Sequence, residues 1–333
     1  MGDDHTINLL LVGLGRQGRR HARVAQNSGA ARIVGTVDPG GEPLPGVPHH
    51  PTVEAALAAL DGGQRPDAAV IATPIGSHAP LAELLLRAGI AVLVEKPMAA
   101  SAEEAAHLVA VAEETGTLLA VGHVERFNPS VQLVRAMLAD GGLGTPVACS
   151  FRRVGLHPPS KPDLDVIHDL AVHDIDVFSV LAGAGAELAG ASGWVGGTGL
   201  VESAHVLLTA GEVHGLVEVN WRTPVRLRSF TVTTDTCFVQ VDYTTQRVEV
   251  VQASTEQELE EFAAFQSHYG AAKRTQLEAR VAEPLAEQMI EFAAAVRGEP
   301  HPHLADGRAG LVAVAVAAEA SAQAGAADIG AHP

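Results

Sequence analysis

The residues with the most distinctive spacing form a glycine motif, Gly13-Leu14-Gly15-Arg16-Gln17-Gly18, directly after an apolar run at 7–12. In such a motif the first glycine permits a tight turn, the second lets the backbone approach a pyrophosphate, and the third allows close helix packing. Amides at the start of the following helix would face the phosphates. The motif therefore predicts a dinucleotide-binding loop with Gly13, Gly15, Arg16, Gln17 and Gly18 at the cofactor.

Asp38 ends the next apolar run, about 25 residues after Gly13, near the position where an acid binds the adenosine ribose in dinucleotide-binding folds. A carboxylate at this point would repel the extra phosphate of NADP, and the next residues, Pro39-Gly40-Gly41-Glu42, add no cation. The sequence therefore predicts NAD as cofactor. Arg16 is the residue through which NADP could still be accepted.

Three further polar segments follow predicted strands, where ligands bind in open parallel sheets. The residues are Thr73, Pro74 and His78 after the third strand, Glu95, Lys96 and Pro97 after the fourth, and His123, Arg126 and Asn128 after the fifth. Lys96 carries the most information, because a lysine fixed between an acid and a proline can polarise a substrate hydroxyl or relay its proton.

A fourth segment, 163–176, reads DLDVIHDLAVHDID and is predicted to enter a helix. Asp169 and His173 are four residues apart, so a helix would turn both toward one site. His168 and His173 are five apart and would point in different directions, which is a poor arrangement for a metal pair. We therefore predict a catalytic base at His173 and no metal site.

In their order and spacing, these motifs resemble the Gfo/Idh/MocA oxidoreductase family. The resemblance is greatest to its branch of bacterial UDP-N-acetylglucosamine 3-dehydrogenases and related sugar dehydrogenases, which share versions of VGHVERFNP, DLAVHDID, VNWRTPVRLR and Glu283-Pro284-Leu285. It implies that Lys96 and His173 act on the substrate hydroxyl and that Asp169 contacts the substrate. It also implies that Pro97 and His78 support the cofactor.

Two departures from that branch bear on the substrate. Asp165 lies where relatives have a glycine-containing run, and His168 lies where an aliphatic residue is common; an extra carboxylate suits an amine, and a net charge of −17 attracts cations. Four arginines could instead clamp a pyrophosphate: Arg152, Arg153, Arg226 and Arg228. A UDP-N-acetylglucosamine-like nucleotide sugar and an aminoglycoside intermediate therefore both stay open. The alternatives are an inositol or polyol dehydrogenase, an aldose oxidoreductase that recycles its NAD, and a non-catalytic NAD-binding sensor.

The elements that must position these residues alternate regularly in the first third of the chain. Short β-branched runs alternate with amphipathic stretches, which predicts an α/β Rossmann domain with a parallel sheet over residues 1–122. The predicted strands are 7–12, 32–37, 68–72, 90–94 and 118–121, and the predicted helices are 21–27, 53–60, 79–88 and 102–114.

The remaining residues, 123–333, are predicted to form an α+β substrate-binding domain with a large, mostly antiparallel open sheet. Strands are expected at 146–154 and across 187–250, an irregular surface segment at 255–280, and helices at 284–296 and 306–322. One face of such a sheet needs cover, so we expect a homodimer or homotetramer.

The composition sets the outer limits. The 333 residues are 47% hydrophobic and 18% charged, which fits two globular domains. The acidic surface disfavours nucleic acid as a partner. The two cysteines, Cys149 and Cys237, indicate neither a disulfide framework nor a thiolate metal site. The acidic start and the short apolar run that stops at Arg16 predict a cytoplasmic protein without a membrane partner.

Overall fold

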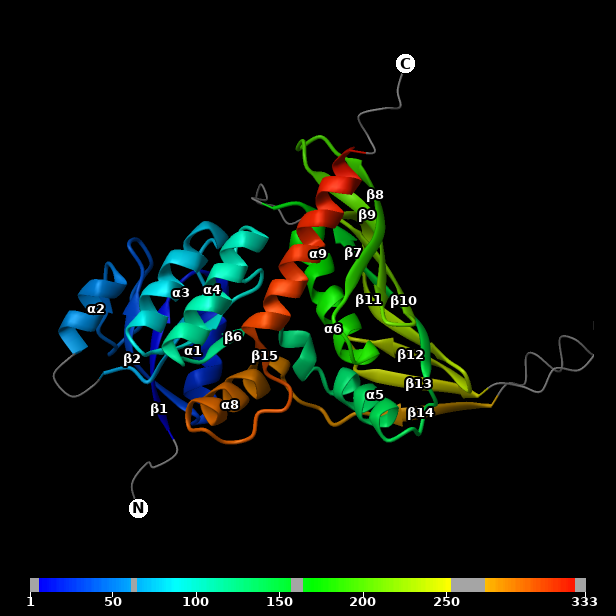
Figure 1. Ribbon diagram of the computed structural model, residues 1–333. Helices are drawn as coiled ribbons and strands as arrows, with labels where there is room; N and C mark the ends of the chain where they lie inside the picture. Colours follow the sequence, from blue (N-terminus) through cyan, green and yellow to red (C-terminus); the bar gives the residue numbers. More distant parts are fainter. Residues whose placement is uncertain (1–5, 61–64, 157–163, 253–272, 327–333) are drawn as a thin grey trace, which may run out of the picture. The chain divides into compact units, whose positions relative to one another are not determined.

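The computed structural model of the protein describes residues 6–60, 65–156, 164–252 and 273–326 (Figure 1). The chain forms two compact units: residues 1–127 with 282–318, and residues 128–281 with 319–333. This division differs from the predicted domains 1–122 and 123–333, because the chain returns to the first unit near its end. Leu285, Met289 and Phe292 of the returning segment are buried in the core of the first unit.

The first unit is built on a seven-stranded sheet with the order β15-β6-β5-β4-β1-β2-β3. All neighbouring strands are parallel except β15 and β6, at one edge of the sheet. This agrees with the predicted Rossmann architecture, in which ligands bind at the carboxyl ends of the strands. The strands are β1 (Ile7–Val12), β2 (Ala31–Val37), β3 (His49–His50), β4 (Ala68–Ile71), β5 (Ala91–Val94), β6 (Leu119–Val121) and β15 (Ala305–Asp306).

Helices cover both faces of this sheet. Their bounds are α1 (Arg16–Ser28), α2 (Val53–Leu60), α3 (His78–Arg87), α4 (Ala102–Thr115), α8 (Pro284–Val296) and the short turns η1 (Ile75–Ser77) and η2 (Val124–Phe127). Helix α1 starts earlier than the predicted 21–27, because the helix begins inside the glycine motif with Gly15 as its N-cap. Helix α4 begins at the predicted residue and ends one residue later than predicted: the Ser101 hydroxyl accepts from the Glu104 amide, and Gly116 stops the helix at φ +64°.

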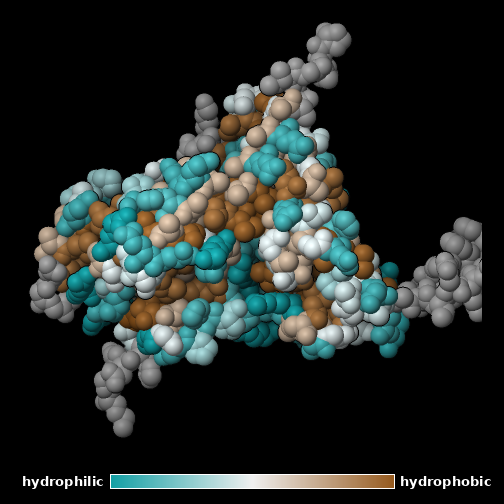
Figure 2. Space-filling view, in the orientation of Figure 1, coloured by the Kyte–Doolittle hydropathy of each residue, from teal (hydrophilic) through white to brown (hydrophobic). Residues whose placement is uncertain are grey.

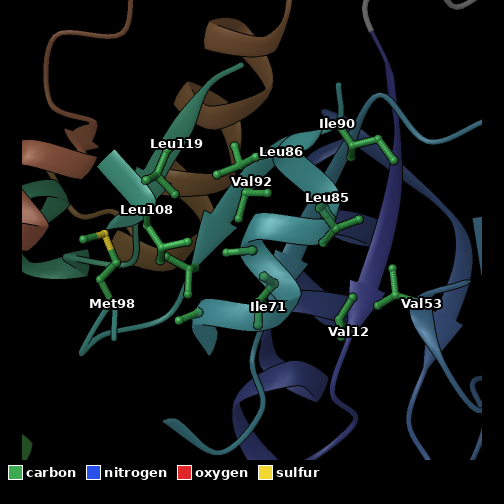
Figure 3. Packing of buried hydrophobic residues seen from close by; sticks show 14 of the residues in the cluster. Val12, Val53, Ile71, Leu85, Leu86, Ile90, Val92, Met98, Leu108 and Leu119 are labelled. Carbon is green, nitrogen blue, oxygen red and sulfur yellow. The ribbon is translucent and has the colours of Figure 1, made fainter. Parts of the chain in front are cut away.

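Alternate residues of each strand supply two separate apolar layers. Leu10, Val12, Ile71 and Val92 lie in a cluster with residues of α2, α3 and α4, part of which Figure 3 shows. Their neighbours along the strands, such as Leu9, face the second cluster with α1 and α8. A strand buried on both faces has to be apolar throughout, which explains the continuous runs in the sequence.

The second unit is built on an eight-stranded sheet with the order β14-β13-β12-β11-β7-β10-β9-β8. The β7 and β10 strands are parallel and every other pair is antiparallel, as the sequence predicts. The strands are β7 (Pro146–Leu156), β8 (Glu187–Val195), β9 (Val201–Ala210), β10 (Val213–Asn220), β11 (Arg222–Thr234), β12 (Cys237–Asp242), β13 (Arg247–Gln252) and β14 (Arg274–Glu278). Strand β14 corrects part of the predicted irregular segment 255–280, because its residues pair with β13; residues 253–272 lie outside the described chain.

The helical elements of this unit are α5 (Pro129–Ala139), the π turn η3 (Ile167–Ala171), α6 (Val172–Ala182) and the last part of α9 (Gly307–Ala326). Its core includes a stacked pair, Phe151 and Phe230, with ring centroids 5.7 Å apart. Among the described helices, α9 alone is long and apolar enough to cross a membrane, a property that the core helix of a globular protein can share.

Hydrophobic side chains also reach the surface of the second unit (Figure 2). Leu207 on β9 and Leu216 on β10 are direct cross-strand partners with exposed fractions of 51% and 37%. Trp194 on β8 is similarly exposed, at 47%. These residues lie on the open sheet for which the sequence predicts cover.

Candidate active site

The glycine loop follows β1 and leads into α1 with the geometry that the sequence predicts. Gly13 has φ +95°, and a Cβ on it would lie 2.5 Å from the carbonyl oxygen of Ala72. A Cβ on Gly18 would lie 1.9 Å from the carbonyl oxygen of Gly13, so this position also excludes a side chain.

Gly15 is different, because its φ is ordinary and a Cβ would meet no protein atom within 4 Å. It is the N-cap of α1, and no side-chain hydrogen bond caps that end. An open approach to an uncapped helix start fits a dinucleotide pyrophosphate. Arg16 is exposed at the first position of α1, and the side-chain amide of Gln17 is used within the protein.

Asp38 follows β2, as predicted, and binds the loop itself. One carboxylate oxygen accepts from the Leu14 amide at 2.7 Å, and the other accepts from the Gly40 and Gly41 amides. Burial alone would raise the pKa of Asp38, but these hydrogen bonds outweigh it and hold that pKa below its ordinary value. Asp38 is therefore an anion beside the glycine loop, which suits a ribose hydroxyl and opposes a phosphate.

Glu95 and Lys96 follow β5, on the same edge of the sheet. The Glu95 carboxylate accepts from the Gln17 amide at 2.9 Å and lies 2.6 Å from the Nε2 atom of His21. The Lys96 amide donates to the other Glu95 oxygen at 3.3 Å. These contacts bring the predicted residues Gln17, Glu95 and Lys96 together and add His21, which the sequence analysis did not select.

His78 and Thr73 lie on the other side of Lys96. The Nδ1 atom of His78 is 2.9 Å from the carbonyl oxygen of Pro97, and its Nε2 atom is 2.9 Å from that of Thr73. The Lys96–Pro97 peptide bond is cis. His78 is 2% exposed, so it supports the segment from within. Pro74 precedes η1 as its N-cap.

The predicted segment after β6 divides between the two units. His123 is buried in the first unit, and the Arg126 amide donates to its carbonyl oxygen at 3.2 Å. Asn128 is buried in the second unit, where its side chain caps α5 and donates to the carbonyl oxygen of Tyr243 at 3.1 Å. Asn128 therefore has a capping role, and its predicted contact with substrate has no support from this geometry.

The predicted helix of the second unit begins with the π turn η3 and continues as α6. Asp169 lies in the turn, and His173 is the second residue of α6; both are partly buried. The turn has i→i+5 hydrogen bonding, with the Val172 amide bound to the carbonyl oxygen of Ile167, so the spacing rule of a regular α-helix does not describe this pair. The indole of Trp221, a residue missed in the sequence, donates to Asp169 at 3.3 Å.

Asp165 is 7% exposed, and both of its carboxylate oxygens are used inside the second unit. One accepts from the His168 amide at 2.9 Å and lies 2.8 Å from that residue's imidazole, and the other accepts from the Ser321 hydroxyl. Burial opposes these bonds, yet they keep the pKa of Asp165 below its ordinary value. We therefore assign Asp165 a capping role and not the predicted contact with an amine.

The arginines predicted to clamp a pyrophosphate divide into two groups. Arg152 pairs with Glu218 at 2.6 Å on an exposed part of the sheet. Arg153 is buried and makes two 2.8 Å bonds to the carboxylate of Asp174, which is fully buried. Both guanidinium groups have carboxylate partners, and the predicted substrate contact of Arg152 has no support from this geometry.

Arg228 and Arg226 remain as candidates. Burial, together with the nearby charges of Arg153 and Arg226, lowers the pKa of Arg228 to about 10. Asp169 acts in the opposite sense, so its carboxylate is also close enough to interact with Arg228. Arg228 therefore adds positive charge near Asp169, and Arg226 lies close enough to Arg228 to interact with it, in an otherwise acidic protein.

Within the described residues, no group of three histidine, cysteine or acidic side chains is arranged to hold a metal ion. Cys149 and Cys237 are both free. Burial raises the pKa of Cys149 to about 12, so this thiol is a core residue rather than a nucleophile.

The strand order, the glycine loop and Asp38 define a dinucleotide-binding Rossmann unit. Comparison with protein families agrees: residues 7–123 match the Gfo/Idh/MocA oxidoreductase family, described as having an NAD-binding Rossmann fold. This segment is therefore similar to the NAD-binding domain of that family.

Curated relatives match about half of this chain. UDP-N-acetylglucosamine 3-dehydrogenase of Acidithiobacillus ferrooxidans is 33% identical over 180 residues, 52% of this chain and 54% of the relative. Inositol 2-dehydrogenase of Rhizobium meliloti is 33% identical over 190 residues, 54% of this chain and 56% of the relative. The chain thus spans little more than half the length of either relative.

The solved structure of UDP-N-acetylglucosamine 3-dehydrogenase GnnA from Acidithiobacillus ferrooxidans has the same fold. It superposes with a TM-score of 0.81 at 24% identity and covers 97% of this chain and 99% of its own. Both units therefore have a counterpart in a known fold.

Proposed function

We propose that this chain is an NAD-dependent dehydrogenase that oxidises a secondary ring hydroxyl of a sugar, of the C3 type, to a keto-sugar. The observation that carries the proposal is the link between Lys96 and the nucleotide loop: Glu95 binds the side chain of Gln17 and the amide of Lys96. A lysine held beside a dinucleotide loop is where an oxidoreductase needs a group for the substrate hydroxyl.

The three catalytic residues have separate tasks. His173 takes the proton of the substrate hydroxyl as a general base. Lys96 stabilises the negative charge that develops on that oxygen. Asp169 orients the sugar, with its own carboxylate steadied by the Trp221 indole. Bound NAD supplies the hydride acceptor.

We infer that NAD is preferred over NADP. Asp38 is ionised beside the loop, and the residues after it, Pro39 to Glu42, bring no positive charge. A 2′-phosphate next to this carboxylate would meet electrostatic repulsion. Arg16, the residue that could offset it, is exposed at the start of α1.

Among sugar substrates we favour a UDP-N-acetylglucosamine-like nucleotide sugar over an aminoglycoside. The aminoglycoside hypothesis depended on Asp165, whose carboxylate is buried and already hydrogen-bonded through both oxygens. The nucleotide-sugar hypothesis depended on arginines, and Arg228, which interacts with both Arg226 and Asp169, supplies positive charge near Asp169. The curated sugar dehydrogenase relative supports this choice, whereas the inositol dehydrogenase relative supports a cyclic polyol as the second candidate.

We also propose that the protein assembles as a homodimer or homotetramer through the open sheet. The exposed cross-strand pair Leu207 and Leu216, with Trp194 two strands away from Leu216, would be covered by a second copy. Light scattering should give a multiple of the 34.4 kDa chain mass at micromolar concentration. A monomeric mass throughout would overturn this proposal.

Activity can be tested by incubating the protein and NAD with UDP-N-acetylglucosamine, myo-inositol or an aminoglycoside and following NADH formation. We expect the nucleotide sugar to be oxidised fastest. Faster oxidation of myo-inositol would favour an inositol or polyol dehydrogenase. The protein could instead bind NAD and oxidise none of the three compounds. If Lys96→Ala then also leaves NAD binding unchanged, the result would favour an NAD-binding sensor.

A further inference from the structure

We propose that His21 is a positioning residue for Lys96. It holds the Glu95 carboxylate, and through it the backbone of Lys96, in a fixed relation to the glycine loop. The inference rests on the proposed function of Lys96. The coupling of the glycine loop, 13–18, to the segment 95–97 through the buried His21 side chain can be measured without any substrate.

The Glu95 carboxylate is the centre of the arrangement. Its Oε1 atom lies 2.6 Å from Nε2 of His21 and accepts from the Gln17 side chain at 2.9 Å. Its Oε2 atom accepts from the Lys96 amide at 3.3 Å. The Glu95 carboxylate therefore connects the first turns of α1 to the backbone of Lys96, two residues after β5.

The carboxylate depends on these donors because it is removed from water. The Glu95 side chain is 12% exposed and that of His21 is 1% exposed. Desolvation raises the pKa of Glu95, but hydrogen bonding and charge from His21, with help from Gln17 and Lys96, lower it below the ordinary value. A buried carboxylate that loses its main partner is costly, so the segment would rearrange to find another donor.

The packing around Glu95 is close at Gly122. A Cβ on Gly122, at the end of β6, would lie 3.1 Å from both the Cα and the Oε2 atoms of Glu95. Glycine at that position lets the carboxylate turn back toward α1. The Glu95 amide also donates to the carbonyl oxygen of Ile71 at 2.9 Å, which fixes its backbone.

A second buried histidine fixes the other side of the lysine. His78, at the start of α3, faces the carbonyl oxygens of Pro97 and Thr73, each at 2.9 Å. The residues before and after Lys96 are thus tied to two different helices, α1 and α3. Loss of His21 would remove the shorter of the two side-chain contacts that tie Glu95 to α1, so the lysine would be displaced without unfolding of the sheet.

The same unit contains a matched control. His303 lies 2.5 Å from Glu291 of α8 through Nδ1, a partly buried histidine–carboxylate pair of the same chemistry. It joins α8 to the segment that follows it. A general stabilising effect of such pairs predicts similar results at His21 and His303, whereas positioning predicts a local effect at His21 alone.

The test compares His21→Leu, which removes the donor, with His21→Gln, which keeps an N–H group, and with His303→Leu. Hydrogen–deuterium exchange of the protein without added nucleotide is followed in peptides that cover 13–18 and 95–97. His21→Leu should speed exchange in both peptides by about tenfold, and His21→Gln should restore most of the protection. His303→Leu should leave both peptides unchanged.

Kinetics with NAD and UDP-N-acetylglucosamine provide the second measurement. A displacement of Lys96 by about 1 Å should lower kcat by about 10-fold to 100-fold with a smaller change in KM, and His21→Gln should recover most of kcat. If His21→Leu does not fold, the double variant His21→Leu/Glu95→Gln removes the buried charge and takes its place. It should show the same faster exchange at 95–97.

The possible failures can be told apart. Exchange at 95–97 that stays unchanged in the folded His21→Leu or double variant would overturn the positioning role, whatever the kinetics show. Equal effects of His21→Leu and His303→Leu at 95–97 would also overturn it. Wild-type turnover by Lys96→Ala would instead overturn the proposed function and leave the coupling of the two loop segments intact.

Discussion

The two units use their polar residues in different ways near the proposed site. At the carboxyl ends of β1, β2 and β5, the predicted residues occupy the loop as expected, and Asp38 and Glu95 bind the same glycine motif. In the second unit, two residues predicted to meet substrate, Asp165 before η3 and Arg152 on β7, bind other side chains instead. Motifs defined by the backbone are thus recovered more faithfully than roles assigned to single charged residues.

The difference has a physical cause. Only glycine is readily accepted where φ is positive or where a carbonyl oxygen occupies the position of a Cβ. Such a glycine is visible in the sequence without knowledge of the rest of the fold. A charged side chain takes the partner that folding brings near. Asp165 binds Ser321, 156 residues away, and Arg152 binds Glu218, 66 residues away. Such pairs can be inferred only once the strand register is known.

The largest expected effect tests whether Lys96 and His173 act on the same hydroxyl. Lys96→Ala and His173→Ala should each lower turnover by a factor on the order of 10² to 10⁴ and leave NAD binding nearly intact. The double variant should be little worse than either single variant, because removal of one group already disables the relay. Steady-state kinetics and calorimetry with NAD would measure both quantities. Wild-type turnover by His173→Ala would contradict the shared site.

The sequence predicts secondary structure best where a strand is buried on both faces. The runs at β4 and β5 are continuous and apolar, and that at β1 is apolar except for Asn8; the predicted bounds lie within one residue of the observed ones. Helix α5 was missed, although Asn128 caps it and Pro129 occupies its first turn, because that segment was interpreted only as a ligand-binding loop.

Two other features, the π turn and the His21–Glu95 pair, could not be predicted from sequence patterns. The π turn η3 depends on packing that periodicity does not encode, so the facing of Asp169 and His173 could not be derived from α-helical spacing. The His21–Glu95 pair joins residues 74 positions apart. A histidine three residues after the last motif glycine was a signal, but only the fold shows its partner.

The second prediction separates glycines that the fold requires from the one that the ligand requires. Gly13→Ala should destabilise the protein by at least about 2 kcal/mol, because of its positive φ and the contact with Ala72. Gly15→Ala should cost less than about 1 kcal/mol but weaken NAD binding by more than about tenfold. Urea unfolding and calorimetry would measure the two effects. Equal loss of stability in both variants would contradict a ligand-driven choice of Gly15.

The third prediction concerns cofactor selection at Asp38. The protein should bind NAD at least about tenfold more tightly than NADP, and Asp38→Ser combined with Pro39→Arg should narrow the gap. The double variant should also bind NAD more weakly, because three backbone amides lose their acceptor. Asp38→Asn is the control that keeps an acceptor and removes the charge. Comparable dissociation constants for the two nucleotides in the unmodified protein would contradict the role of Asp38.

The smallest expected effect separates the roles of two acidic residues in one short segment, Asp165 and Asp169. Asp165→Ala should lower the free energy of unfolding by about 1 to 3 kcal/mol at neutral pH, because a buried carboxylate with charge-assisted bonds is lost. Asp169→Ala, four residues later, should leave stability nearly unchanged and raise KM for the sugar. Equal changes in unfolding free energy would contradict this division of roles.

The pH dependence of Asp165→Ala gives the sign of the interaction. The pKa of Asp165 is lowered in the folded protein, so its carboxylate stabilises the fold above the unfolded value of about 3.9. That contribution is lost as the pH falls through the folded value. The stability difference between the unmodified protein and Asp165→Ala should therefore shrink from about pH 5 downward in urea titrations. A difference that grows toward low pH would mean that the carboxyl is held protonated, in which case Asp165 could not serve as the anionic partner of His168.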